Sequence, residues 1–173
     1  MKFTCSSSKL QKSISLVEKA VAARSSLPVL ENIYFELSNG QLKLRGNDLE
    51  IGIENKFALE GETQDGNVLV KAKTISNIIA KLPNQELEFT VNDSNHMDIK
   101  GAKVDFDILG TSTEEYPVFP PVEVGLQLQF KVHELRELIK HTLFAVSSDE
   151  TKQFLNGILI KIEADTIYFV ATD

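Results

Sequence analysis

LNGILIKIEADTIYFVATD, at residues 155–173, aligns without a gap with LENIYFELSNGQLKLRGND, at residues 30–48, when the chain is shifted by 125 positions. Each stretch holds two strand-like runs around a polar turn, the pattern of a β-hairpin. Apolar positions coincide along the whole length, as in Phe35 with Ile160 and Leu44 with Phe169. Two unrelated hairpins of similar shape would match at only one or two positions in phase. The repeat therefore predicts two related domains in tandem.

The first 110 residues predict the order strand, helix and three strands, twice over. Period-2 and helical spacings of apolar residues define these elements. The first copy is expected at residues 2–6, 8–24, 32–37, 41–45 and 49–53, and the second at 67–72, 74–82, 86–91, 96–100 and 104–110. Leu49, Ile51 and Ile53 are expected on the buried face of their strand. The order predicts an α+β fold, with helices on one face of antiparallel sheets.

A proline-rich, acidic stretch, TSTEEYPVFPPVEVG at residues 111–125, interrupts the pattern and predicts a domain linker. Beyond it the pattern begins again, with an expected strand at 129–132 and a helix at 134–144. We predict a first domain at 1–120, a linker at 121–128 and the beginning of a second domain at 129–173. With the first copy as template, closing its sheets takes roughly 75 to 80 further residues, so we expect a fragment of a longer protein.

Composition indicates a globular protein, with 42% hydrophobic and 25% charged residues. No run approaches the roughly 20 apolar residues that span a bilayer, and the first residues lack the apolar core of a secretory signal. We therefore predict a cytoplasmic location and no membrane partner. The single Cys5 is expected to be a buried strand residue rather than a reactive thiol.

Charge is distributed unevenly along the chain. The net charge is −7, yet the segments 9–24, 71–82 and 131–142 hold 10 Lys or Arg against 3 acids, while the remainder holds 8 against 22. Lysine suits helix surfaces in general, but glutamate suits them equally and is scarce in the first two segments. The pattern predicts one surface that attracts polyanions and another that repels them. No zinc spacing, helix-turn-helix or aromatic platform is evident, so contact would be with phosphates alone.

Catalytic motifs are missing from the sequence. His96, His133 and His141 lack ligand spacing, and no glycine-rich phosphate loop occurs. Asp105 and Asp107 alternate along one strand, which is typical of solvated acids more than of an acid/base pair. The sequence thus predicts a non-enzymatic scaffold without cofactor or metal. A hydrolase using these two aspartates is the enzymatic alternative.

Several motifs together resemble the bacterial DNA sliding clamp, the beta subunit of DNA polymerase III. They are MKFTCSSSKL at the start, RSSLPVLENIYFEL, LKLRGNDLEIGIE, EEYPVFP, and FLNGILI followed by VATD at the end. The resemblance implies a DNA-clamp fold with three internally duplicated domains per chain. It also implies a homodimeric ring, when full length, whose helices face duplex DNA. The implied function is that of a polymerase processivity factor, which slides without sequence specificity.

The resemblance further implies partners and sites. The partners are duplex DNA, the DNA polymerase III alpha subunit, the clamp loader and other proteins with clamp-binding motifs. The implied sites are DNA contacts at Arg24, Lys73, Gln153 and Phe154, the edge of a partner-motif pocket at Lys152 and Thr172, and a ring interface at Ile78, Leu82, Phe106 and Ile108.

Three points remain open at the level of sequence. Ordinary core packing is the alternative for the four interface residues, and for Ile78 and Leu82 the two interpretations weigh equally. Asp149 falls in the DNA-contacting loop, where an acid is a poor neighbour for phosphate. The whole chain could also be a module of repeated α+β domains that binds proteins and makes no DNA contact.

Overall fold

The structure is a computed structural model that describes residues 1–119, 125 and 127–173. The chain divides into two compact units, Met1–Pro120 and Pro121–Asp173. Most of the predicted linker at 121–128 lies outside the described residues. The two units are therefore taken one at a time.

The first unit contains the predicted order of elements twice. The first copy consists of β1 (Lys2–Ser6), α1 (Ser7–Val17), the short 3₁₀ turns η1 (Glu18–Ala20) and η2 (Pro28–Glu31), β2 (Asn32–Ser38), β3 (Gln41–Asn47) and β4 (Gly52–Ala58). The second copy consists of β5 (Gly66–Lys71), α2 (Ala72–Ala80), β6 (Glu86–Val91), β7 (His96–Gly101) and β8 (Val104–Leu109). The α+β fold class is confirmed.

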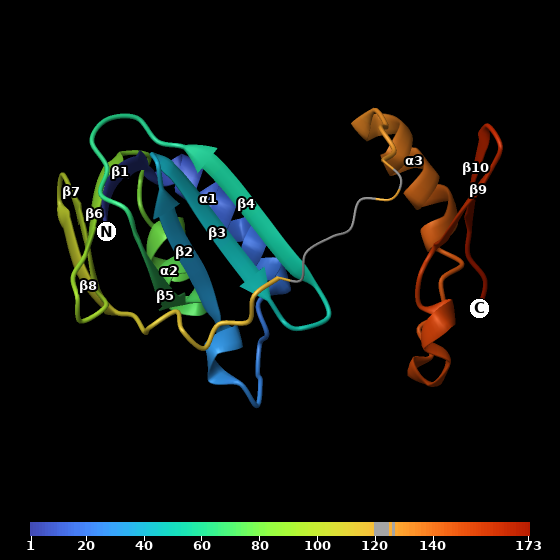
Figure 1. The fold of residues 1–173 in the computed structure, drawn as a ribbon, viewed down its shortest axis with the longest axis horizontal. Helices are drawn as coiled ribbons and strands as arrows, with labels where there is room; N and C mark the ends of the chain where they lie inside the picture. The colour runs from blue at the N-terminus through green and yellow to red at the C-terminus, as the bar shows by residue number, and fades with distance from the viewer. Residues whose placement is uncertain (120–124, 126) are drawn as a thin grey trace. The chain divides into compact units, whose positions relative to one another are not determined.

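Each copy contributes its first strand to the other copy's sheet. The two antiparallel sheets have the orders β1-β6-β7-β8 and β4-β3-β2-β5. β1 therefore pairs with β6, and β5 pairs with β2. Figure 1 shows α1 and α2 side by side on one face of the β4-β3-β2-β5 sheet. This exchange of strands joins the two copies into one folded unit.

One hydrophobic core lies between the two helices and the two sheets and takes residues from all of them. Phe3 on β1 and Phe89 on β6 stack with ring centroids 4.7 Å apart, and both are buried. Leu10 and Ile14 of α1, and Ile75 of α2, join the same core. Apolar burial of this extent is the main stabilising contribution to such a unit.

Cys5 belongs to this core, as the sequence predicted. It is 5% exposed on β1, and burial raises the pKa of its thiol to about 12. A thiol held neutral in this way is unreactive at neutral pH.

In the first unit, two predicted elements have bounds that differ markedly from the structure. The helix predicted over 8–24 ends at Val17, continues as η1 and gives way to extended backbone at Val21. The strand predicted over 49–53 is present but was predicted to start too early, because β4 spans Gly52–Ala58. Asp48 Oδ1 accepts the backbone N–H groups of Glu50 and Ile51, which stabilises a turn there instead.

That turn also exposes two residues that were predicted to be buried. Leu49 has a positive φ of 77° and is 61% exposed, and Ile51 is 58% exposed. The alternation of apolar residues begins at Leu49, within the turn. Periodicity alone therefore predicted too early a start for strand β4. The helix predicted over 74–82 is present, although its bounds lie two residues earlier.

The second unit contains α3 (Val132–Leu143), η3 (Glu150–Leu155), β9 (Leu159–Glu163) and β10 (Thr166–Val170). The strand predicted at 129–132 is absent. Its counterpart β1 forms by pairing with β6, and the described part of the second unit holds no counterpart of β6. Lys131 instead caps α3, and Glu134 accepts its backbone N–H.

The hairpin repeat is visible in the register of both units. Leu37 pairs with Leu42 in the first unit, and Ile162 pairs with Ile167 in the second, each 125 positions later. The turns also correspond, because Asn39 and Ala164 have positive φ angles of 51° and 50°. The gapless repeat in the sequence thus corresponds to the same hairpin formed twice.

Candidate nucleic-acid interface

The helical layer of the first unit presents cations to solvent because its apolar residues are used in the core. Leu10, Ile14 and Val17 of α1 are buried, and so are Ile75 and Ile79 of α2. The basic residues on the remaining faces are exposed, namely Lys9, Lys12 and Lys19 of the first helical segment and Lys73 and Lys81 of the second. Helical periodicity therefore separates an apolar face from a cationic one.

Some of the basic residues in these helical segments are already engaged by other groups of the protein. Lys71 forms an ion pair with Glu31, and the hydrogen bond from Lys71 holds the pKa of the Glu31 carboxyl below its usual value. Lys9 Nζ donates to the carbonyl of Ala58 at 2.8 Å and lies over the ring of Phe57. Neither Arg24 nor Lys73 takes part in the ion pairs found among the described residues.

Glu18, the acid of the first helical segment, has a structural role. Its Oε2 accepts a hydrogen bond from Ser76 Oγ at 2.7 Å. Ser76 lies on α2, so the bond ties the end of α1 to the second helix. Glu18 therefore fixes the two helices against each other, a role that the charge pattern alone did not reveal.

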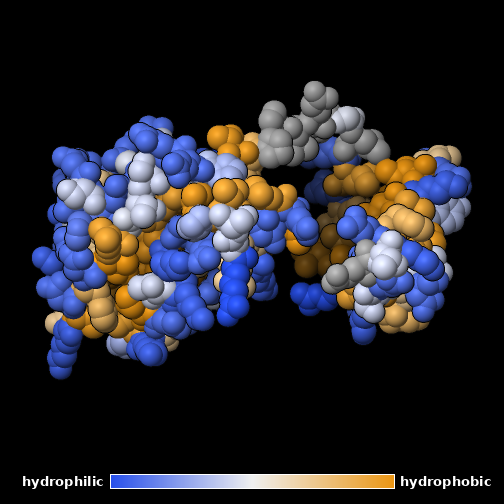
Figure 2. Space-filling view, turned by 90° about the horizontal axis from the view of Figure 1, so that it is seen from below, coloured by the Kyte–Doolittle hydropathy of each residue, from blue (hydrophilic) through white to orange (hydrophobic). Residues whose placement is uncertain are grey.

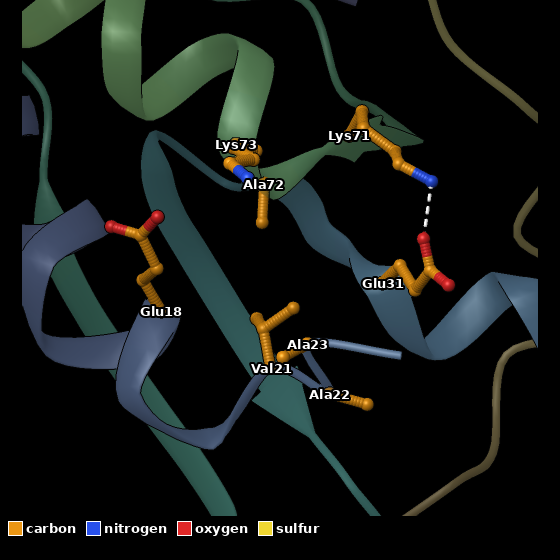
Figure 3. A pocket seen from close by; sticks show the side chains of 8 residues that line it. All are labelled: Glu18, Val21, Ala22, Ala23, Glu31, Lys71, Ala72 and Lys73. Carbon is orange, nitrogen blue, oxygen red and sulfur yellow. Dashed lines mark hydrogen bonds and ion pairs between the residues drawn. The ribbon is translucent and has the colours of Figure 1, made fainter. Parts of the chain in front are cut away.

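A pocket of about 270 Å³ lies where these elements meet. Figure 3 shows Glu18 on one side, the Lys71–Glu31 pair on the other, and Lys73 at the start of α2. Val21, Ala22 and Ala23 line the wall that lies across from Ala72 and Lys73 (Figure 3). Lys73 lines this pocket, whereas Arg24 follows Ala23 in the chain and is exposed without being one of the lining residues.

The four predicted ring-interface residues come from α2, the turn after it, and the edge strand β8. Ile108 is buried at 6% exposure and belongs to the core of the first unit. Ile78, Leu82 and Phe106 are half-buried and pack against that core while keeping part of their surface open. Core packing thus explains Ile108 most directly, while Ile78, Leu82 and Phe106 keep part of their apolar surface open to solvent.

The sites predicted in the second unit lie on η3 and after β10. Gln153 is exposed and the Phe154 ring is 83% exposed. Lys152 is exposed too, with φ and ψ of −118° and 63° that break the helical turn. Thr172 is exposed just beyond β10.

Asp149 has a local role that explains an acid in this loop. Its Oδ1 accepts the backbone N–H of Thr151 at 2.9 Å and the hydroxyl of Thr151 at 2.7 Å. These bonds, the side-chain one foremost, hold the pKa of the Asp149 carboxyl below its usual value. Asp149 is therefore the N-cap of η3.

The aspartates of the hydrolase alternative lie in open solvent. Asp105 and Asp107 are both exposed on β8, and Asp107 contacts His96 Nδ1 at 3.0 Å. Within the described residues, no group of three or more His, Cys, Asp or Glu side chains could hold a metal ion. No helix in the same part of the chain has the length and apolarity to cross a membrane.

A duplicated α+β unit followed by the hairpin of a related one defines the class of DNA clamps. The chain matches the DNA polymerase III beta subunit, N-terminal domain, over residues 1–120 and the central domain of that subunit over residues 129–173. The chain belongs to the DNA polymerase III beta subunit family.

Named relatives agree with this assignment. The beta sliding clamp of Synechococcus elongatus is 35% identical, and that of Bacillus subtilis 33%, each over the whole of this chain. Among solved structures, the Bacillus subtilis DNA polymerase sliding clamp is similar with a TM-score of 0.92 at 33% identity. The Pseudomonas aeruginosa DnaN sliding clamp bound to griselimycin gives 0.94 at 29% identity. The chain covers 46% and 48% of the two named relatives and 47% of each solved chain.

Proposed function

We propose that this chain is part of a sliding clamp, a ring that encircles duplex DNA and tethers a replicative polymerase to it. The observation that carries the proposal is the exposed cationic face of α1, η1 and α2 on a chain whose net charge is −7. Phosphate contacts from such a face hold DNA without reading its bases, so the protein can slide. Tethering keeps the polymerase at a high effective concentration near the primer end.

Within this proposal, Arg24 and Lys73 contact DNA from the first unit, and Gln153 and Phe154 contact it from the second. All four side chains are exposed, as such contacts require. Lysine at position 73 supplies a point charge rather than a bidentate fork, which suits contact without fixed register. Asp149 turns its carboxylate toward Thr151, which limits its repulsion of phosphate.

Lys152 and Thr172 form the edge of a pocket for partner motifs, and Ile78, Leu82 and Phe106 contribute apolar surface to a ring interface in the proposed homodimer. The proposed partners are duplex DNA, the polymerase III alpha subunit, the clamp loader and other proteins with clamp-binding motifs. The protein has no catalytic role of its own in this proposal and acts in the cytoplasm.

Charge reversal tests the DNA-facing assignment. In the full-length protein, the double variant Arg24→Glu/Lys73→Glu should bind DNA more weakly. The slope of log affinity against log salt should fall by about 1 for each phosphate that the variant no longer neutralises. Binding is measured by fluorescence anisotropy of a labelled duplex across a salt series.

Lys56→Glu is the matched control. Lys56 is exposed on β4, on the sheet face that points away from the helices. It should leave the salt slope unchanged. Equal slopes for the double variant and the wild type would contradict the assignment and favour a protein-binding module.

A further inference from the structure

The residues after β8 cross the outer face of the β4-β3-β2-β5 sheet, the face away from the helices. Thr111 exchanges two backbone hydrogen bonds with Leu69 on β5, at 2.9 and 3.1 Å. Thr113 Oγ1 donates to Asn67 Oδ1 on the same strand at 2.9 Å. We call residues 111–119 the strap. Its first part is thus attached to the edge strand β5.

The middle of the strap packs on β2 and β3. The Tyr116 ring lies 5.3 Å from the ring of Tyr34 on β2, and its hydroxyl donates to the carbonyl of Arg45 on β3 at 3.4 Å. Tyr116 is 7% exposed, and burial raises the pKa of its hydroxyl to about 12. Leu69 pairs with Tyr34 on this face and is 1% exposed, although it lies outside the main core. The strap therefore takes part in a second, small buried cluster.

The end of the strap is held by Arg45 and β4. The Arg45 guanidinium lies 5.4 Å from the ring centre of Tyr34 and 5.6 Å from that of Phe119, so it is flanked by two aromatic rings. Glu54 fixes its Nε at 2.7 Å, and Glu36 lies 3.8 Å from its Nη1. Stacking of this kind uses the planar shape of arginine as well as its charge.

The Phe119 ring packs directly against Gly52. A Cβ on Gly52 would lie 2.7 Å from Cζ of Phe119, closer than real Cβ atoms come, and at the tight distances of 3.0 and 3.1 Å from Cε2 and Cε1 of the same ring. The three atoms nearest to that position all belong to Phe119. Gly52 has no positive φ, so its backbone does not call for glycine. The Phe119 ring would instead have to shift if residue 52 carried a Cβ.

We propose that the strap is a latch that fixes where the chain leaves the first unit, with Arg45, Gly52 and Tyr116 as positioning residues for Phe119. The strap contacts β5, β2, β3 and β4 in the order in which they lie in the sheet. The chain toward the second unit consequently starts from β4 rather than from the end of β8. The latch lies on the sheet face opposite the helices and stands independently of the proposed DNA contacts.

Amide exchange in the full-length protein tests the latch. The Tyr116 N–H is bound to the Thr113 carbonyl at 3.1 Å and reports on the middle of the strap, while the Thr111 N–H, which donates to the Leu69 carbonyl on β5, is an internal reference at its start. Phe119→Ala and Gly52→Ala should each speed exchange at Tyr116 by about tenfold and leave Thr111 unchanged. Arg45→Lys should do the same, since it keeps the charge but loses the planar stack.

The double variant Gly52→Ala/Phe119→Ala should exchange no faster than Phe119→Ala alone, because the added methyl acts only on the ring. Val118→Ala is the matched control, since Val118 is 86% exposed in the same segment. Additive effects in the double variant, or Tyr116 exchange unaltered by Phe119→Ala, would overturn the latch.

A second readout follows the position of the second unit. Spin labels at the exposed positions Asp93→Cys and Asp165→Cys report the separation of the units, and the buried Cys5 thiol is spared at neutral pH. Labelled protein is diluted with unlabelled protein to limit pairs between chains. Phe119→Ala should broaden the distance distribution, whereas Val118→Ala should not. A distribution as narrow in Phe119→Ala as in the wild type would refute the positioning role.

Discussion

Cys5 illustrates how one buried residue makes the stability of the first unit depend on pH. Burial raises the pKa of its thiol to about 12, from an ordinary value of 9.0. The folded state therefore favours the neutral thiol. The buried neutral thiol contributes its full stabilisation below the thiol pKa of the unfolded chain. That stabilisation is lost as the pH rises from there toward the thiol pKa of the folded chain.

Above pH 9, the wild type should lose stability faster than Cys5→Ala, with a difference in slope of about 1.4 kcal/mol per pH unit. The comparison isolates Cys5, because both proteins share Tyr116 and the lysines. Urea unfolding at several pH values between about 8 and 11 measures the difference. Parallel pH profiles for the two proteins would show that the thiol is not buried as described.

At the scale of elements, helix α1 and strand β3 approach each other at a glycine. A Cβ on Gly46 would lie 2.1 Å from the carbonyl oxygen of Val17 and 3.0 Å from its carbonyl carbon. These are backbone atoms, so the end of α1 would have to shift. Gly46 therefore sets the distance between the helix and the sheet.

Gly46→Ala should destabilise the first unit by about 3 kcal/mol, the upper end of the cost of overpacking. Gly157→Ala is the control, since a Cβ there meets nothing within 4 Å, and it should be near neutral. Thermal unfolding followed by circular dichroism is the measurement. A stable Gly46→Ala variant would mean that α1 does not pack against β3 as closely as described.

The hairpins were predictable because their alternation is strict and their repeat has no gap. The order of elements and the placement of Cys5 followed from the same periodicities. The exchange of β1 and β5 between sheets was not predictable, since pairing partners distant in sequence leave no local signal. The turn at 48–51 was missed because Asp48 caps it while Leu49 and Ile51 imitate a strand.

The candidate site, like the fold, was predictable only in part. Charge along the helices predicted the exposed lysines, whereas the engagement of Lys71 by Glu31 depends on packing between distant segments. The roles of Glu18 and Asp149 also depend on partners that only the fold supplies. Arg45 and Gly52 gave no signal in the sequence, because their partners in the strap lie far along the chain.

At the scale of the whole molecule, the two units differ in how much apolar surface they bury. In the second unit Leu159, Ile160, Ile162, Tyr168 and Val170 of the hairpin are each at least 41% exposed. Helix α3 contributes no buried residue. Figure 2 shows extensive hydrophobic surface on this unit. Leu159, Tyr168 and Val170 lie on one face of the hairpin and Ile160 and Ile162 on the other, so apolar side chains are exposed on both faces. Exposed apolar surface of this extent is typical of a contact site for another element or protein.

The 173-residue polypeptide should therefore bind the dye ANS, and the full-length protein should bind it less per molecule. Ile160→Lys and Ile162→Lys should each lower the dye signal, while Lys161→Glu, on the same strand, should not. ANS fluorescence at matched concentrations is the readout. Dye binding unaffected by the two isoleucine changes would place the exposed apolar surface elsewhere.

The central claim, a cationic helical face that holds DNA inside a ring, is tested most directly by retention on closed and open DNA. In this assay a clamp loader places the full-length protein on nicked circular DNA, and retention is followed by gel filtration before and after linearisation. We predict stable retention on the circle and rapid loss once the DNA has ends, with faster loss from the circle for Arg24→Glu/Lys73→Glu. Equal retention on circular and linear DNA would contradict the claim, since it would show binding by contact rather than by enclosure.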